Sequence, residues 1–241
     1  MDKRIACVLG ASGGIGAALV AELLASGRYD TIHAGSRSPM PTTSGVMPFS
    51  FDLTDESTIA KAAAAIAATG PLDLIIIATG ALQDTATGMA PEKSFRAIDP
   101  AVMAQVFAIN TIGPALIAKH FLPLLPRARR CVLAAISARV GSIGDNRLGG
   151  WHSYRASKAA LNMLIANFAI EAQRRNPQAM AVALHPGTVD TALSAPFQTG
   201  VAPDHLFTPH YSASCLLRVI DTLTPADNGG LFAWDGARIP F

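Results

Sequence analysis

Short apolar runs alternate with stretches of helical spacing along this 241-residue chain. The runs predict strands over residues 5–9, 31–34, 74–78, 131–137, 179–185 and 231–234. Between them, apolar residues recur every three or four positions, which predicts helices from residue 17 and over 57–68, 100–122 and 154–174. Asp55 or Ser57 can cap the helix over 57–68, and Ser153 the helix over 154–174. This alternation predicts an α/β fold with a doubly wound parallel sheet and helices on both faces.

The chain gives no sign of a division into several domains. Residues 1–241 contain no linker and no shift in composition, and half of them are hydrophobic, which suffices for one large core. We therefore expect a single domain. The longest irregular stretch is the Gly- and Pro-rich segment 186–210, which we expect to include a mobile lid over a ligand.

A glycine-rich turn follows the first predicted strand. It runs from Gly10 through Ser12, Gly14 and Ile15 to Gly16 and leads directly into the first predicted helix. Gly10 allows the tight turn, while Gly14 and Gly16 let the backbone approach a pyrophosphate at the helix start. The spacing is G-x-x-x-G-x-G rather than the common G-x-G-x-x-G, and a turn without a ligand is the alternative. The context favours a dinucleotide site in a Rossmann-type fold.

Tyr154 and Lys158 are four positions apart and so share one face of their predicted helix. A free tyrosine titrates near ~10. A cation beside the phenol should lower its pKa, so that the pair moves a proton to or from a substrate oxygen. Taken alone, such a pair is more often an ordinary solvated helix face.

Together the two motifs resemble the short-chain dehydrogenase/reductase family, and the resemblance covers essentially the whole chain. The nearest subgroup contains small carbonyl reductases and C-factor-type signalling proteins, which have similar sequences around Gly141–Ile143 and Trp234–Gly236. The other matching positions follow in the family's order. They are Asp52-Leu53, Thr79-Gly80, Asn110, Ser137, and Pro186, Gly187, Val189 and Thr191 of the nicotinamide segment.

The resemblance implies a role for each of these residues. Tyr154 is the general acid when a carbonyl is reduced, and Lys158 assists it and bonds the nicotinamide ribose. Asn110 holds a water that links Lys158 to solvent; a helix-interior asparagine bonded to nearby backbone is the alternative. Asp52 and Leu53 contact the adenine, and the glycine turn, Thr79-Gly80 and residues 186–191 hold the rest of the cofactor.

The catalytic serine is the main departure from the family pattern. Family members read Ile-Ser-Ser at this strand end and use the second serine, whereas this chain reads Ile136-Ser137-Ala138. Alternation along the strand would turn Ser137 to the other face. Ser142 is a second candidate, and we slightly favour Ser137 turned inward at the strand end. A hydroxyl here would stabilise the oxyanion that develops on the carbonyl.

The cofactor preference follows from the end of the second strand. Enzymes that use NAD place an acid there to bond the ribose 2′-hydroxyl, but this chain has Ser36 followed by Arg37. A guanidinium fits a 2′-phosphate. We expect NADP(H) to be favoured over NAD(H), with an exposed arginine of no special role as the alternative.

Charge and cysteine content restrict the binding partners and the cellular location that we expect for the protein. A net charge of +2 gives no basic field for nucleic acid. We expect no apolar segment to approach the ~20 residues that a membrane span needs. Three cysteines and six histidines show no metal-ligand spacing, which favours a reduced cytoplasmic protein. The family resemblance implies a homodimer or homotetramer formed through the helices that carry Asn110 and Tyr154.

These features predict an NADPH-dependent oxidoreductase that reduces a ketone or aldehyde, or runs the reverse reaction. Trp151, Phe197, Leu206, Phe207 and Tyr211 are candidates to line an apolar substrate pocket or to pack within a lid. The alternative function is a dinucleotide-binding signalling or sensor protein with little turnover, which Ala138 favours and the intact Tyr154 and Lys158 disfavour.

Overall fold

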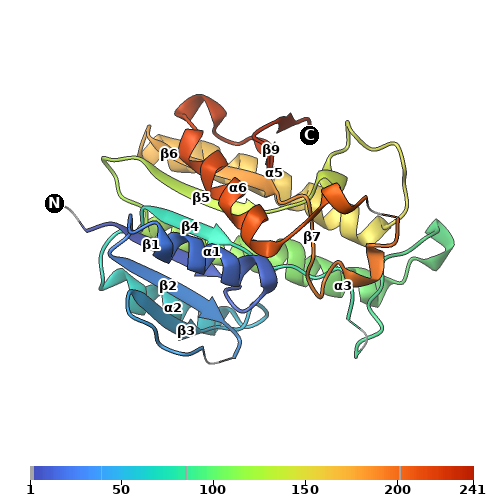
Figure 1. The fold of residues 1–241 in the computed structure, drawn as a ribbon, viewed down its shortest axis with the longest axis horizontal. Helices are drawn as coiled ribbons and strands as arrows, with labels where there is room; N and C mark the ends of the chain where they lie inside the picture. The colour runs from blue at the N-terminus through green and yellow to red at the C-terminus, as the bar shows by residue number, and fades with distance from the viewer. Residues whose placement is uncertain (1–2, 39, 85, 201) are drawn as a thin grey trace.

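A mostly parallel sheet forms the centre of the computed structural model, which describes residues 3–38, 40–84, 86–200 and 202–241 (Figure 1). Its strand order is β10-β9-β6-β5-β4-β1-β2-β3, and only β10 runs antiparallel to its neighbour. The strands are β1 (Ile5–Leu9), β2 (Thr31–Ser36), β3 (Val46–Ser50), β4 (Leu74–Ile77), β5 (Cys131–Ile136), β6 (Ala179–His185), β9 (Leu231–Ala233) and β10 (Arg238–Ile239).

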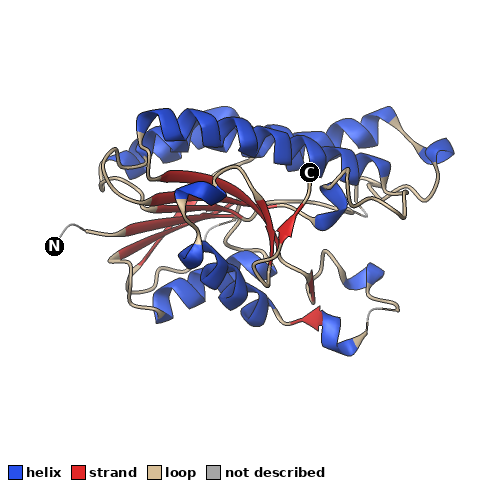
Figure 2. Cartoon of the chain, turned by 90° about the horizontal axis from the view of Figure 1, so that it is seen from above, coloured by secondary structure: helices blue, strands red, loops and turns tan. Residues whose placement is uncertain are grey.

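Helices cover both faces of this sheet (Figure 2). They are α1 (Gly14–Ala25), α2 (Glu56–Ala67), α3 (Pro100–Phe107), α4 (Gly113–Phe121), α5 (His152–Arg175) and α6 (Pro209–Thr222). Side chains alternate along each strand: Leu133 of β5 joins the core under α2, α4 and α5, and Val132 joins the core under α1 and α6. The predicted doubly wound α/β fold is confirmed.

The order of the strands places a ligand crevice between β1 and β4. The chain proceeds outward from β1 through β2 to β3, then returns to β4 on the other side of β1. In such sheets ligands bind beyond the carboxyl ends of the strands at this switch point. The glycine turn follows β1 at Gly10, and Thr79-Gly80 follows β4, so both predicted cofactor segments lie there.

Several elements were not predicted from the sequence, among them the strands β3 and β10 and the helix α6. The edge strand β3 has the sequence Val-Met-Pro-Phe-Ser, in which the proline breaks the strand signal. Helix α6 follows the irregular segment and is capped by Thr208, whose hydroxyl accepts a bond from the Tyr211 N–H. The predicted Asp55 cap of α2 is confirmed by its bond from the Ser57 N–H.

The predicted helix over 100–122 is one helical run with an irregular centre. Between α3 and α4 a π-helical turn covers Ala108–Ile112 and contains Asn110. The run Pro100–Leu124 is long and apolar enough to cross a membrane, with a mean hydropathy of 1.6, contrary to the expectation that no segment would qualify. Its residues Ile117 and Phe121 are fully buried in the core, so packing against the sheet accounts for part of the apolar character, while 39% of the apolar window is buried.

Two short paired strands hold the two ends of the irregular segment 186–210 together. Thr188–Val189 (β7) pairs in parallel with Leu206–Phe207 (β8), and 3-10 turns occupy Ala195–Phe197 and Pro203–His205. The segment between these two short strands covers one side of the crevice, and its mobility stays a prediction.

Candidate active site

The candidate proton donor Tyr154 lies in the first turn of α5, whose start is fixed by a remote carboxylate. Glu92 is 5 % exposed and accepts bonds from the Ser153 N–H and the Ser153 hydroxyl. The Glu92 carbonyl also accepts from the Trp151 N–H at 2.6 Å, and Trp151 has the left-handed φ of 49°. The expected cap by Ser153 is wrong: its own polar groups donate to Glu92, which takes the place of a capping side chain. Nothing in the local sequence signals this partner, 61 residues away.

Lys158 lies one turn further along α5 and is almost fully enclosed, at 3 % exposed. Its ammonium donates to the Ile136 carbonyl at the end of β5, at 2.9 Å, and lies 5.8 Å from the centre of the Tyr154 ring. Burial lowers the pKa of Lys158 to about 8.

Burial also raises the pKa of Tyr154 to about 12. The expectation that Lys158 lowers this pKa is wrong for the protein alone, since desolvation of the phenolate is the only cause found and it acts upward. The phenol is therefore protonated at neutral pH. That form suits a proton donor in reduction better than a base.

Asn110 joins the site through the irregular turn of its helix. Its amide forms a two-bond pair with the Ala81 backbone, accepting from the N–H at 2.9 Å and donating to the carbonyl at 2.8 Å. It also donates to the Ser157 hydroxyl of α5 at 3.2 Å. A methyl group on Gly80 would lie 3.4 Å from the Lys158 ammonium and 3.5 Å from Asn110 Oδ1. Both side chains therefore lie close to the backbone of Gly80.

The three residues considered for the serine role occupy different surroundings. Ser137 is 2 % exposed and donates its hydroxyl to Asn162 Oδ1 of α5 at 2.6 Å. Ala138 lines the cavity that holds Tyr154 and Lys158. Ser142 donates to the Pro240 carbonyl and does not line that cavity. Ser137 and Ala138 both line the cavity, but the hydroxyl hydrogen of Ser137 is directed to α5 and Ala138 carries no hydroxyl.

Two adjoining cavities form the predicted cofactor crevice, and both are lined by Ala78, Thr79, Gly80 and Leu193. The first, of about 440 Å³, includes the predicted residues Gly10, Ser12, Ser36, Arg37, Asp52 and Leu53. The second, of about 270 Å³, includes the predicted residues Ile15, Ser137, Tyr154, Lys158, Pro186, Gly187 and Val189. Most of the predicted set therefore meets along one continuous crevice.

Gly14, Gly16 and Thr191, which were also predicted to hold the cofactor, line neither cavity but pack tightly at the glycine turn. A methyl group on Gly16 would lie 2.1 Å from the Gly10 carbonyl oxygen, and one on Gly14 would lie 2.7 Å from the Thr191 side chain. Gly10 has the positive φ of 94° and its own methyl position is closed by Ala78. Each close contact requires glycine, as expected of a turn that holds the backbone close to a phosphate.

The residues present fit a dinucleotide. The Thr79 hydroxyl is buried without a hydrogen-bond partner among the described residues, and it lies where the two cavities meet. A buried hydroxyl without a partner is costly, which favours a ligand that supplies one. Arg37 and Asp52 also line the first cavity. The pKa of Asp52 is lowered chiefly by bonds from the Thr54 N–H and hydroxyl, with a smaller contribution from Arg37.

Aromatic side chains divide into two groups. Trp151 contacts Phe197 of the irregular segment, with ring centres 5.1 Å apart, and its ring lies 6.2 Å from that of Tyr154; all three line the second cavity. Phe207 and Tyr211 instead pack on Trp234 and do not line it. The structure thus places Trp151 and Phe197 in the candidate pocket and Phe207 and Tyr211 in packing, while Leu206 pairs with Thr188 and does not line the cavity.

His185 also lines the second cavity, which the sequence interpretation missed. The available signal was its position, at the end of a strand and directly before Pro186. No group of acidic, cysteine or histidine side chains that could hold a metal ion occurs among the described residues.

Comparison of the sequence and the fold with known proteins identifies related chains. Residues 4–201 match the family model for short chain dehydrogenase. An uncharacterized oxidoreductase of Schizosaccharomyces pombe is 29% identical over 99% of this chain and 98% of its own length. The C-signal protein of Myxococcus xanthus is 35% identical over 72% of this chain and 95% of its own. Among solved structures, the NADPH-bound carbonyl reductase from chicken fatty liver is 27% identical, covers both chains fully and superposes with a TM-score of 0.86.

Proposed function

Because the chain belongs to the short-chain dehydrogenase family and is an oxidoreductase of that family, we propose that it reduces a ketone or aldehyde with NADPH. The observation that carries this proposal is the position of Tyr154. A protonated, half-buried phenol lies beside a buried ammonium in the cavity that continues the dinucleotide crevice. The likeness to an NADPH-bound carbonyl reductase supports the same reaction.

The roles of the residues follow from these positions. When bound, the nicotinamide supplies a hydride to the carbonyl carbon. The Tyr154 hydroxyl then gives its proton to the oxygen on which negative charge develops. Lys158 sits behind Tyr154, where an ammonium stabilises the resulting phenolate. Asn110 fixes the Ala81 backbone and Ser157 around this pair, and we propose that it also positions the water that resupplies the proton.

The test is NADPH oxidation by the unaltered protein with a panel of aldehydes, aliphatic ketones, aryl ketones and quinones. Turnover with a member of this panel supports the proposal. Binding of NADPH without turnover of any of them would favour the alternative function below.

We expect the cofactor preference to depend on Ser36 and Arg37. Arg37 lines the first cavity and is exposed, so its guanidinium can bond the 2′-phosphate of NADPH. A charge-assisted bidentate contact is worth about 1.5–3 kcal/mol, or roughly ten- to a hundred-fold in affinity. Replacing both residues, as Ser36→Asp with Arg37→Ala, should reverse the preference, because the acid repels the phosphate and bonds the ribose hydroxyl. Fluorescence titration of both proteins with NADH and NADPH measures this, and equal affinities in the unaltered protein would contradict it.

The role of Ser137 can be tested by removing its hydroxyl. Because the hydroxyl hydrogen goes to the buried Asn162 Oδ1, we expect Ser137→Ala to reduce stability by about 1–3 kcal/mol, the cost of leaving a buried acceptor without its donor, and to leave turnover within a few-fold. Urea denaturation and steady-state kinetics give the two values. A loss of turnover by a factor of ~10²–10³, the effect of one lost oxyanion donor, would instead establish Ser137 as that donor.

A signalling function is the second candidate. Two observations favour it: the 35% identity to the C-signal protein and the absence of a hydroxyl at Ala138. Under this function the chain would bind the dinucleotide tightly and turn over slowly with every carbonyl. Binding measured together with turnover in the panel above separates the two functions.

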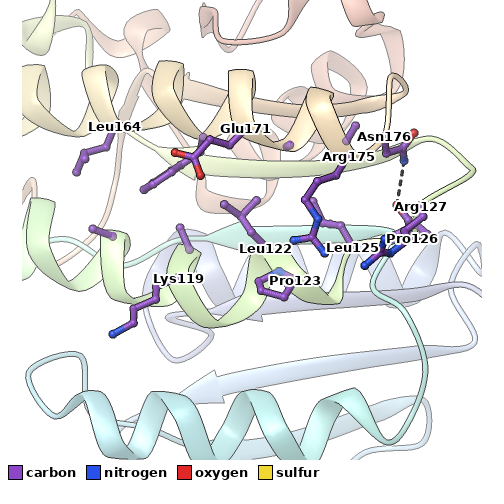
Figure 3. A pocket seen from close by; sticks show the side chains of 15 residues that line it. Lys119, Leu122, Pro123, Leu125, Pro126, Arg127, Leu164, Glu171, Arg175 and Asn176 are labelled. Atoms are coloured by element: carbon purple, nitrogen blue, oxygen red, sulfur yellow. Dashed lines mark hydrogen bonds between the residues drawn. The ribbon is translucent and has the colours of Figure 1, made fainter.

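We propose further that two copies associate through α4 and α5. Ile112, Met163 and Ile170 are each more than half exposed on this side of the molecule. A groove runs between the helices, with Lys119 on the α4 wall and Leu164 and Glu171 on the α5 wall (Figure 3). A light-scattering mass near that of the 25.0 kDa monomer would contradict this.

We also propose a reducing, cytoplasmic location. The three cysteines are buried and form no disulfide, which agrees with it.

A further inference from the structure

We propose that His185 donates a hydrogen bond from Nε2 to the carbonyl oxygen during reduction, in place of the hydroxyl that Ala138 lacks. This inference rests on the proposed carbonyl reduction and adds a second donor to it. It starts from a chemical gap, namely that the substrate oxygen lacks a second hydrogen-bond donor. Tyr154 gives one donor to the substrate oxygen, Ser137 directs its hydrogen to Asn162, and Ala138 has none to give.

The fold places His185 next to the residues that form this gap. In the register of β5 and β6, Ile136 is opposite Leu184, and the Ser137 N–H bonds the Leu184 carbonyl at 2.8 Å. The next residue, His185, is therefore the neighbour of Ser137 across the sheet. Leu184 packs under α1 and α6, so alternation turns the His185 side chain to the opposite face, the side of α5 that carries Tyr154. His185 and Tyr154 line the same cavity.

The two ring nitrogens of His185 have different surroundings. Nδ1 is buried and has no hydrogen-bond partner among the described residues. Nε2 also makes no hydrogen bond to the described part of the chain, but it is not among the buried atoms that lack a partner. Nε2 is therefore the nitrogen that reaches the open space of the cavity.

These surroundings select one tautomer of the ring. Burial, and to a smaller degree Arg139, lower the pKa of His185 to about 4, so the ring is neutral at pH 7. A neutral imidazole has one N–H donor and one acceptor. Orphaned buried N–H groups are rarer than orphaned acceptors, which puts the lone pair on Nδ1 and the hydrogen on Nε2. The cavity then contains a donor that no protein group uses.

In the proposed reaction Tyr154 supplies the proton, and His185 forms a hydrogen bond without transferring one. The carbonyl carbon accepts the hydride of NADPH, and the C=O π pair becomes a lone pair on oxygen. Tyr154 gives its proton to that oxygen, which leaves an alcohol and NADP⁺. His185 keeps its proton throughout and stabilises the developing charge, as an oxyanion-hole side chain does.

The test compares three replacements of His185. The amide nitrogen of glutamine lies where Nε2 does, whereas that of asparagine lies near Nδ1. His185→Gln should therefore keep kcat within about tenfold, while His185→Asn and His185→Phe lower it by ~10²–10³. NADPH affinity by fluorescence titration and Tm should stay close to those of the unaltered protein in all three.

A gain-of-function variant completes the test. Adding Ala138→Ser to His185→Phe restores a hydroxyl to the cavity and should recover turnover at least tenfold. Nitrogen NMR of the unaltered protein should show the neutral Nε2–H tautomer at pH 7. Turnover unchanged in His185→Phe, a rise in KM alone, equal losses in the Gln and Asn variants, or an Nδ1–H tautomer would each overturn the inference while leaving carbonyl reduction intact. No turnover in the unaltered protein would overturn the proposed function and this inference with it.

Discussion

Tyr154→Phe should abolish carbonyl reduction and leave NADPH binding intact. The substitution removes one hydroxyl and keeps the ring, so the edge contact with Trp151 is retained. General-acid catalysis contributes a factor of about 10²–10⁴. Removing the only protonated phenol in the cavity should lower kcat by that factor. Single-turnover measurement of NADPH oxidation, together with a fluorescence titration of NADPH, checks both parts.

A matched control exists in Tyr211. This tyrosine is 46% exposed, packs beside Phe207 and Trp234, and does not line the cavity with Tyr154. Tyr211→Phe makes the same chemical change and should leave kcat unchanged. Near-normal turnover in Tyr154→Phe would show that the proton comes from another group. Loss of NADPH binding in that variant would show that Tyr154 holds the cofactor rather than the substrate oxygen.

The layered fold could be predicted because its signals are local. Strands such as β1 and β5 are continuous apolar runs, and a parallel sheet covered on both faces needs such runs. The glycine turn was predictable for a similar reason, since close approach of Gly16 to Gly10 leaves room for no side chain. Strand β3 was missed because Pro48 interrupts its pattern, which an edge strand tolerates.

The site was only partly predictable because several of its features depend on distant contacts. The Glu92 carboxylate that holds the start of α5 comes from a loop elsewhere in the sequence. The π-helical turn around Asn110 lets its amide bond Ala81, whereas the pattern alone predicts an ordinary helix. The direction of the Ser137 hydroxyl depends on Asn162, which lies 25 residues away.

The electrostatics of the tyrosine–lysine pair needed the structure for the same reason. Spacing puts Lys158 on the same helix face as Tyr154, and an ammonium in water would lower the pKa of the phenol. Depth of burial is not encoded in that spacing. Lys158 is buried and Tyr154 is half-buried, and desolvation shifts the pKa of each toward its neutral form. The pair is therefore held as a phenol and an easily deprotonated amine.

Lys158→Met should stabilise the protein at pH 7 while removing most of its turnover. Burial lowers the pKa of Lys158 from 10.5 to about 8, so the folded chain carries a charge at pH 7 that it solvates poorly. One pKa unit corresponds to about 1.36 kcal/mol, which makes this cost about 3 kcal/mol. The bond from the charged ammonium to the Ile136 carbonyl, worth about 1.5–3 kcal/mol, is lost in the variant. We expect a net gain of about 1 kcal/mol in the free energy of unfolding.

The gain should depend on pH in one direction. Between about pH 8 and 10.5 the unfolded chain still binds the proton that the folded chain has released. The stability of the unaltered protein therefore rises with pH in this window, relative to a variant that lacks the group. The advantage of Lys158→Met is largest below pH 8 and disappears as the pH approaches 10.5. Lys61→Met, on the exposed side of α2, makes the same change without burial and should alter neither stability nor turnover.

Urea denaturation of the unaltered protein and both variants at pH 7 and pH 10 measures this dependence. A constant difference between Lys158→Met and the unaltered protein at the two pH values would mean that the ammonium is well solvated in the folded chain. An unstable variant would mean that the bond to Ile136 outweighs burial. The expected result identifies Lys158 as a residue that costs folding free energy, which a chain retains when the buried charge serves the reaction at Tyr154.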